Sequence, residues 1–559
     1  MTRPFCLLAI ICASIFLSAC QPVEIKPGYA DAIASAHPLA TEAGIEILQQ
    51  GGNAFDAAIT VTSVLAVVEP YSSGIGGGGF YLLHRDADQK RIMLDGRERA
   101  PLAATRDMYL DEKGNVIPKA SIDGALAAGI PGIPASLVHL AEHYGNLPLT
   151  QTLAAAIRHA REGFPVDDIY RKMAGFRLKA MQQDDDARAI FLRAGDVPEL
   201  GTIITQPDLA NTLEAIATNG MQGFYHGEIA QRMVEDVRAN GGIWSREDLA
   251  EYRVVEREPI TGTYQQWQIT SAAPPSSGGV ALVSMLNMLE NLPDAKADAE
   301  MKTHQLTEVM RRAYRDRAEF LGDSDFVDVP VNKLINKSHA KNLLQNYQSD
   351  DATPSEALKA IPVPGDRSQD TTHFSILDKD GNRVSATLSI NYPFGACMVA
   401  KGTGVLLNDE MDDFSMKPGV PNVYGLVGAE ANAIEPGKRP LSSMSPSFVD
   451  GPDGFAIIGT PGGSRIITMV LHGILAYTRD ASAQAIVSQP RMHHQYLPDT
   501  IQLEPGALSE DIRDALTLRG HRLSALTNTF GNMQVITVRG DDIQAASDPR
   551  GIGSAQVTR

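Results

Sequence analysis

The sequence contains few cysteines. Three of the four lie within the first twenty residues, and only Cys397 belongs to the rest of the chain. A single cysteine cannot form an intrachain disulfide, and it is most simply a small buried apolar residue. No Cys/His set has the spacing of a zinc site. The fold must therefore depend on its own core.

Basic residues are also scarce relative to acidic ones. The chain has 49 Lys and Arg against 67 Asp and Glu, a net charge of -18. Nucleic-acid binding depends on Lys and Arg that neutralise phosphates, so a nucleic-acid partner is disfavoured. No apolar run is long enough to span a bilayer. With 559 residues and 43% hydrophobic content, the composition predicts two domains or one large intertwined unit.

The N-terminus has the pattern of a targeting segment. Arg3 precedes the apolar run "FCLLAIICASIFL", which is too short for a membrane span but suits the core of a signal peptide. The run leads to Leu-Ser-Ala-Cys, which resembles the bacterial lipobox. We therefore expect residues 1–19 to be removed and Cys20 to carry lipid, with Gln21 implying the outer membrane on the periplasmic side. A plain signal peptide cleaved nearby is the alternative.

Helical patterns dominate the first half of the chain. Residues 28–70 read as helical, with a break at Gly51-Gly52 and an end at Pro70. The glycine-rich segment that follows leads into "FYLLHR", which reads as a strand. Helical patterns return between about residues 150 and 320, including "MKTHQLTEVMRRAYRDRAEFLG".

The second half opens with a segment of different character. Residues 340–370 are polar and marked by Pro and Gly, so an exposed linker is expected there. The next stretch, "THFSILDKDGNRVSATLSI", alternates around Asp-Lys-Asp-Gly and predicts two paired strands. A long loop over residues 415–440 and a helix that opens at Gly462-Gly463 follow.

Two motifs invite a functional reading that the context does not support. Residues 74–79 fit GxGxxG, but Glu69-Pro70 precedes them and a strand follows, the reverse of a dinucleotide site, so a close-packed turn is predicted. His493-His494 would point to opposite faces of a strand and could not easily share a metal ion. No GxSxG elbow is present, so a serine hydrolase of the α/β type has no nucleophile.

Three later segments carry side chains suited to chemistry. "LLNDEMDDFS" places Glu410, Asp412 and Asp413 together, "RPLSSMSP" supplies Ser442 and Ser443, and "GTPGGSRIIT" puts two glycines at a helix start. Each segment alone is commonplace, as an acidic turn, a Ser-rich loop and a helix cap.

Together with residues 69–101, these segments resemble the γ-glutamyltransferase family of N-terminal-nucleophile hydrolases. The matches are "EPYSSGIGGGGF", "LDGRERAP", "PPSSGG", "TTHFS", "LLNDEMDDFS", "PNVYGLVGAEANAI", "RPLSSMSP", "GTPGGSRIIT" and "HHQYLPD". The resemblance implies an α+β fold, a four-layer αββα sandwich. It also implies γ-glutamyltransferase or glutathione hydrolase activity without a cofactor or metal, acting on glutathione or related γ-glutamyl compounds.

The resemblance further implies that the precursor cuts itself between Asp370 and Thr371. The products would be a heavy chain, residues 20–370, and a light catalytic chain, residues 371–559, held together as a heterodimer. An internal threonine has no strong base beside it. An N-terminal threonine carries its own α-amino group, whose pKa of about 7.7 to 8.0 suits proton transfer near neutral pH.

Further site residues follow from the same resemblance. Arg97, Ser442 and Ser443 match residues that hold the α-carboxylate of the glutamyl group, and a guanidinium suits a carboxylate because it forms two parallel hydrogen bonds. The residues that match the ammonium-binding set are Asn391, Glu410 and Asp413. Gly462 and Gly463 match the oxyanion-binding glycines, Ser389 stands where many members have a threonine beside the nucleophile, and Tyr424 matches a lid residue.

Two other functions stay open at this point. A cephalosporin or glutaryl acylase of the same fold would share the nucleophile, and a non-catalytic solute-binding lipoprotein would share the lipobox. If the chain is the transferase, the glutamyl group passes to water or to an amino acid or peptide amine.

Overall fold

Two antiparallel sheets form the centre of the computed structural model, which describes residues 28–293, 298–358, 371–417 and 419–558. The first sheet, in spatial order, consists of β20 (Ser554–Thr558), β1 (Asp31–Ser35), β9 (Thr372–Leu377), β10 (Arg383–Ser389), β2 (Gly78–Arg85), β3 (Lys90–Gly96) and β6 (Val255–Arg257). The second consists of β19 (Asp542–Ser547), β18 (Gln534–Arg539), β14 (Gly454–Gly459), β13 (Ser447–Gly451), β8 (Trp267–Ser271) and β7 (Ile260–Tyr264).

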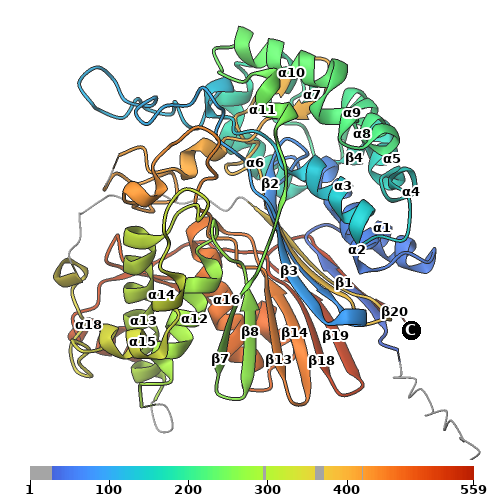
Figure 1. Ribbon diagram of the computed structural model, residues 1–559. Helices are drawn as coiled ribbons and strands as arrows, with labels where there is room; N and C mark the ends of the chain where they lie inside the picture. The colour runs from blue at the N-terminus through green and yellow to red at the C-terminus, as the bar shows by residue number, and fades with distance from the viewer. Residues whose placement is uncertain (1–27, 294–297, 359–370, 418, 559) are drawn as a thin grey trace, which may run out of the picture.

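Helices cover the outer face of each sheet (Figure 1). Helices α1 (Pro38–Gln49) and α2 (Ala54–Val68) pack on the first sheet, and α12 (Gly278–Leu289) and α16 (Ile466–Tyr477) pack on the second. Apolar side chains fill the space between the sheets, among them Leu82, Leu377, Phe448, Ile457 and Ile536. The predicted four-layer αββα sandwich is confirmed.

The remaining helices surround this sandwich. Those that follow the first sheet's β2–β3 hairpin are α3 (Ile133–His143), α4 (Leu149–Thr152), α5 (Ala154–Glu162), α6 (Asp168–Met181), α7 (Asp185–Phe191), α8 (Pro207–Asn219), α9 (Gln222–Tyr225), α10 (Gly227–Ala239) and α11 (Arg246–Ala250). Beside the second sheet lie α13 (Ala299–Phe320), α14 (Val331–Leu334), α15 (Lys337–Leu343), α17 (Ala483–Ser488) and α18 (Glu510–Leu518). Among the described residues, no helix is both long and apolar enough to cross a membrane.

The hairpin predicted around Asp-Lys-Asp-Gly is present as β9 and β10. Leu377 pairs with Arg383 across its turn, and Thr372 pairs with Leu388 at its open end. Side chains alternate between two buried faces: Phe374 and Ile376 join the core under α2, while His373 faces the second sheet. Both strands are therefore buried on both sides, as expected for the central strands of a sandwich.

Two sequence-based predictions need correction. Residues 31–35, predicted to begin a helical region, form β1, because pairing with β9 and β20 outweighs the helix propensity of an alanine-rich segment. The predicted linker 340–370 is only partly exposed. Ser355 is fully buried and its hydroxyl donates to Tyr496 O at 2.7 Å, which anchors a 3-10 turn at Ser355–Leu358. Residues 359–370 of that segment lie outside the described part of the chain.

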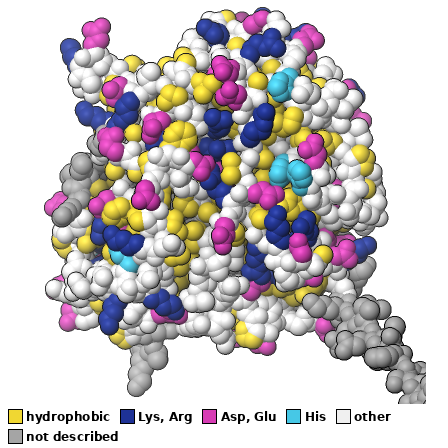
Figure 2. Space-filling model, in the orientation of Figure 1, with side chains coloured by type: hydrophobic (Ala, Val, Ile, Leu, Met, Phe, Trp, Pro, Cys, Tyr) yellow, Lys and Arg dark blue, Asp and Glu magenta, His cyan; other side chains and the backbone are white. Residues whose placement is uncertain are grey.

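Charge is distributed without a single dominant patch on the face drawn in Figure 2. Acidic and basic side chains alternate across it, so the net charge of -18 is not concentrated into one acidic surface there.

Candidate active site

The candidate site lies at one end of the sandwich, where strands from both sheets stop. Thr371 directly precedes β9, and the antiparallel register places Ser389, the last residue of β10, beside it. The two hydroxyl oxygens are 3.5 Å apart, and both side chains are buried. The sheet thus holds the candidate nucleophile on a rigid support. Asp370, the other side of the predicted cleavage site, lies outside the described residues, as does Cys20.

The glycine-rich segment 74–79 forms the close-packed turn that the sequence predicts. A Cβ on Gly76 would lie 2.0 Å from Leu406 O, and one on Gly77 would lie 2.1 Å from Ser389 O. Backbone atoms cannot yield as a flexible side chain can, so larger residues are excluded. The turn packs the start of β2 against the end of β10 and fixes the position of the Ser389 carbonyl oxygen.

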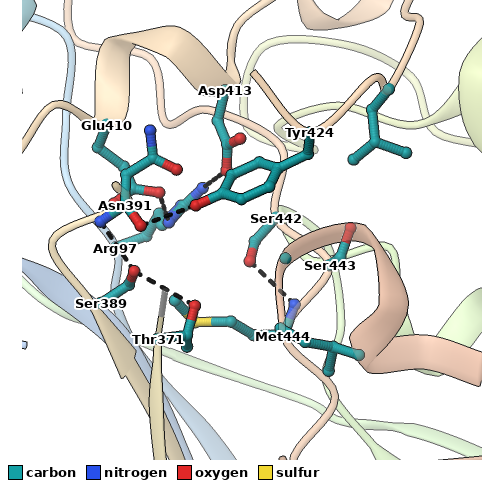
Figure 3. A pocket seen from close by; sticks show the side chains of 13 residues that line it. Arg97, Thr371, Ser389, Asn391, Glu410, Asp413, Tyr424, Ser442, Ser443 and Met444 are labelled. Atoms are coloured by element: carbon teal, nitrogen blue, oxygen red, sulfur yellow. Dashed lines mark hydrogen bonds and ion pairs between the residues drawn. The ribbon is translucent and has the colours of Figure 1, made fainter. Parts of the chain in front are cut away.

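Arg97 lies in the centre of the site and is fully buried. It follows β3 directly, and its guanidinium forms ion pairs with Glu410 and with Asp413, the latter at 2.5 Å (Figure 3). Its Nε donates to Pro440 O at 3.2 Å. A 3-10 turn, Glu410–Asp413, presents both carboxylates to the same guanidinium. The predicted cation and the two predicted acidic residues are therefore in direct contact with one another.

The electrostatics of this cluster are unbalanced toward acid. Burial raises the pKa of Glu410 well above its usual range, and burial also raises the pKa of Glu98 to about 7, each opposed by the charge of Arg97. Burial alone would lower the pKa of Arg97, but the carboxylates of Glu410, Asp413 and Glu98 outweigh it and raise that pKa. Arg97 thus faces three acidic groups, and burial favours the protonated forms of two of them, Glu98 and Glu410.

The serine pair lies on the other side of the cavity, on a loop that enters β13. The Oγ of Ser442 accepts a hydrogen bond from Met444 N at 3.0 Å. Arg317 donates to Ser443 Oγ at 3.3 Å and to Ser277 Oγ at 3.0 Å, so it braces this loop from α13. Arg317 carries no signal in the sequence, because it is one of several similar arginines in its helix and only the fold places it against the serine hydroxyls.

The glycine pair begins the turn that leads into α16. Gly462 has φ 138° and Gly463 has φ 55°, a region that favours glycine. A Cβ on Gly463 would lie 2.5 Å from the ring of Tyr424. The second glycine is therefore required both by its backbone conformation and by the aromatic ring packed on it.

Residues 419–428, which we call the covering segment, lie over the cavity. The hydroxyl of Tyr424 donates to Asn391 O at 2.7 Å, and the amide of Asn422 donates to Asp413 Oδ1 at 2.9 Å. Asn391 has φ 72° and its side-chain amide donates to Asp409 O at 3.0 Å. Figure 3 shows the Tyr424 ring beside Arg97, with Thr371 and Ser389 below both.

One cavity is lined by most of the predicted residues, but Gly462 is not among its lining residues. Its lining includes Arg97, Thr371, Ser389, Asn391, Glu410, Asp413, Tyr424, Ser442, Ser443 and Gly463. About 20 Å³ of space remains between these side chains, room for about one water molecule. A larger ligand must therefore displace ion-pair partners and move the covering segment.

Potential metal ligands cluster at one place among the described residues. His304, Glu308 and His521 have ligand atoms within 4.8 Å of one another. Glu308 already pairs with Arg312 and lies 3.4 Å from Arg311, so two cations oppose a metal ion there. His493 and His494, set aside from the sequence as a metal pair, bond to Thr468 and Asp499 respectively.

Comparisons with known proteins agree over most of the chain. Residues 40–558 match the Gamma-glutamyltranspeptidase family. The glutathione hydrolase proenzyme of Escherichia coli (strain K12) is 42% identical over 542 residues, 95% of this chain and 92% of that protein. The crystal structure of a cephalosporin acylase from Bacillus halodurans superposes with a TM-score of 0.82 at 28% identity, covering 97% of this chain and 99% of that one. The crystal structure of Helicobacter pylori gamma-glutamyltranspeptidase superposes with a TM-score of 0.57 at 42% identity, covering 59% of this chain and 95% of that one.

Proposed function

We propose, from the premise that this chain belongs to the gamma-glutamyltranspeptidase family, that Thr371 is the nucleophile of a self-processing glutathione hydrolase and γ-glutamyltransferase. The observation that carries the proposal is the cavity itself. It holds a threonine at a predicted cleavage point beside a buried arginine and two carboxylates. That charge pattern is complementary to the carboxylate and ammonium of a γ-glutamyl group.

Substrate binding is an exchange of ion-pair partners. Arg97 gives up Glu410 and Asp413 and takes the substrate α-carboxylate, which the hydroxyls of Ser442 and Ser443 also approach. The freed Glu410 and Asp413 then accept hydrogen bonds from the α-ammonium. Asn391 joins them through its side-chain oxygen, because its amide nitrogen is committed to Asp409 O. A zwitterion inserted in this way leaves the number of buried ion pairs unreduced.

The chemistry begins with hydrolysis of the peptide bond between Asp370 and Thr371, in which water supplies the new carboxyl group of Asp370 and Thr371 gains a free α-amino group. That amine takes the proton of the Thr371 hydroxyl as Oγ attacks the γ-carbonyl carbon. The N–H groups of Gly462 and Gly463 stabilise the oxyanion, where one such donor contributes about 2.7–4 kcal/mol. The proton then passes to the leaving amine, and a glutamyl ester remains on Thr371.

The ester has two fates. Water or the amine of an amino acid or peptide attacks the ester carbonyl, loses a proton to the α-amino group and restores the Thr371 hydroxyl. The first route is hydrolysis and the second is transpeptidation. Ser389, 3.5 Å from the nucleophilic oxygen, is placed to orient it.

Cleavage leaves the two chains associated, because their strands interleave. In the first sheet, β9 and β10 of the light chain lie between β1 and β2 of the heavy chain. In the second sheet, β13 of the light chain pairs with β8 of the heavy chain. Separating residues 20–370 from residues 371–559 would break both sheets, so the processed enzyme is a stable heterodimer.

A glutaryl or cephalosporin acylase is the second candidate, favoured by the overall superposition on such an acylase. A glutaryl group has the carboxylate for Arg97 but no ammonium. It would leave Glu410 and Asp413 buried without a cation once Arg97 had turned to the substrate, so the γ-glutamyl group fits better. Turnover of glutaryl amides but not of γ-glutamyl amides would reverse this choice.

The N-terminal segment supports a periplasmic enzyme attached to the outer membrane by lipid on Cys20, outside the described residues. Metabolic labelling with a radioactive fatty acid tests this. Label is expected on the wild-type protein and not on Cys20→Ala, and an unlabelled wild-type protein of the size left by signal-peptide removal would contradict the anchor.

Self-cleavage is the experiment that tests the proposed function. Purified protein should give two chains, the smaller with the N-terminal sequence Thr-Thr-His-Phe-Ser, and should release the aniline from a γ-glutamyl anilide. Thr371→Ala should remain one chain without turnover. Thr218→Ala, on the exposed face of α8, is the matched control and should behave as wild type. Turnover by uncleaved protein would contradict the proposal.

A further inference from the structure

A single buried side chain, Gln495, connects the covering segment to the turn formed by residues 462–465, which we call the glycine turn. Its Nε2 donates to Tyr424 O at 3.2 Å and to Gly425 O at 3.1 Å. Its Oε1 accepts from Ser464 Oγ at 2.7 Å and from His493 Nε2 at 2.8 Å. Both amide hydrogens and both acceptor positions of the glutamine are therefore used.

Gln495 lies near the point where the covering segment and the glycine turn are already in contact. Ser464 directly follows Gly463, and the ring of Tyr424 packs on Gly463 closely enough to exclude a Cβ there. The hydroxyl of Tyr314 in α13 donates to Ser464 O, which holds the turn from the side of the helix layer. The covering segment and the glycine turn thus share one packing contact and one hydrogen-bonded amide.

We propose that Gln495 is a positioning residue that couples closure of the covering segment over the γ-glutamyl group to the orientation of the oxyanion-binding turn. The inference rests on the proposed function and goes beyond it, because Gln495 contacts neither the nucleophile nor the glutamyl-binding side chains. With the covering segment in place, Gln495 is only 6% exposed and its amide has both backbone acceptors. When the segment lifts, the amide loses these two acceptors and turns to new partners, so Ser464 loses a fixed partner.

The coupling has a consequence for both substrate retention and chemistry. Gln495 helps to keep the segment closed while the ester is formed and broken, which lowers KM for the donor. It also keeps the N–H groups of the glycine turn aimed at the developing oxyanion, which raises kcat. A residue that served only to stabilise the fold would change neither quantity in the folded enzyme.

Gln495→Glu removes the hydrogen bonds to the covering segment but can keep those from Ser464 and His493. The carboxylate keeps the shape and an acceptor for Ser464 and His493, but it places an oxygen against the two carbonyl groups of the covering segment. With γ-glutamyl-p-nitroanilide, we expect KM to rise about tenfold or more and kcat to fall at least about threefold, because two hydrogen bonds are replaced by repulsion. Gln484→Glu makes the same chemical change on the exposed surface of α17 and should leave both values unchanged.

Hydrogen exchange followed by mass spectrometry supplies the structural readout. In Gln495→Glu, amides of residues 419–428 should exchange faster, while those of α16 keep wild-type protection. Ser464→Ala, which removes only the contact on the turn side, should also speed exchange of residues 419–428. This second variant keeps the test usable if Gln495→Glu does not fold.

The outcomes separate this inference from the proposed function. If the wild-type protein neither cleaves itself nor turns over the anilide, the proposed function fails. If the wild type is active and both Gln495→Glu and Ser464→Ala match it in KM, kcat and exchange of residues 419–428, the coupling through Gln495 is wrong.

Discussion

Replacing Arg97 by alanine should damage both binding and folding, and the structure sets the size of each effect. The guanidinium is fully buried and supplies the cation for Glu410 and Asp413. Removing one partner of a buried ion pair typically costs about 3–5 kcal/mol. The substrate loses two charge-assisted hydrogen bonds, each contributing about 1.5–3 kcal/mol, which corresponds to a loss of roughly 10²–10⁴ in kcat/KM. We expect the lower end, because Arg97 must first leave its own carboxylates.

The stability effect should depend on pH. Burial already raises the pKa values of Glu98 and Glu410, and the charge of Arg97 opposes that rise, so without Arg97 their folded pKa values lie still further above the unfolded value of about 4.3. At pH values between the unfolded and the raised folded pKa values of these carboxyl groups, the folded protein binds more protons than the unfolded one. The free energy of unfolding therefore falls as pH rises through this range. The deficit of Arg97→Ala should therefore be larger at pH 8 than at pH 5.

Two assays measure these effects. Steady-state kinetics with a γ-glutamyl anilide gives kcat/KM, and thermal unfolding at both pH values gives the stability deficit. Arg85→Ala is the matched control, because its pair with Asp88 lies at the surface, where such pairs contribute about 0–1 kcal/mol. An Arg97→Ala enzyme with wild-type kcat/KM would refute the role given to this residue.

Three further changes test separate parts of the site. Tyr424→Phe removes the 2.7 Å hydrogen bond to Asn391 O but keeps the ring packed on Gly463. The loss of this hydrogen bond should raise KM roughly 2- to 12-fold. An unchanged KM would show that the hydroxyl does not hold the covering segment. Ser389→Ala should slow self-cleavage and lower kcat about tenfold, because the Ser389 hydroxyl accepts a hydrogen bond from Asn391 N at 2.8 Å and lies beside Thr371. Wild-type rates of cleavage and turnover would contradict a role for this hydroxyl. Burial raises the pKa of Glu69 to about 7, opposed by its hydrogen bond from Thr372, so stability should fall as pH rises from about 4.5 to 7. Glu69→Gln should remove that slope in thermal unfolding, and a slope equal to wild type would mean that other groups cause it.

Local patterns were sufficient to predict some elements. The alternation on either side of Asp-Lys-Asp-Gly predicted the β9–β10 hairpin, because residues close in sequence pair there. The β1 strand could not be predicted in the same way. Its partners, β9 and β20, lie more than 300 residues away in sequence, and nothing within residues 31–35 outweighs their helical composition.

The site shows the same division between residue types and geometry. The resemblance pointed to Arg97, Glu410 and Asp413 one by one, but only the fold shows that they bind one another before a substrate does. Arg317 and Gln495 act through neighbours, Ser443 in one case and the covering segment in the other. No local pattern marks a residue whose importance lies in the partners that folding gives it.

A γ-glutamyl ester on Thr371 would identify this residue as the nucleophile, and trapping the ester is the decisive measurement. Processed enzyme is mixed with a γ-glutamyl anilide, quenched in acid within the first turnover, digested and analysed by mass spectrometry. The peptide beginning Thr-Thr-His-Phe-Ser should gain the mass of one glutamyl acyl group on Thr371, and hydroxylamine should remove this group. Turnover with the acyl group on another residue, or with no acyl group at any quench time, would contradict the role of Thr371 as the nucleophile.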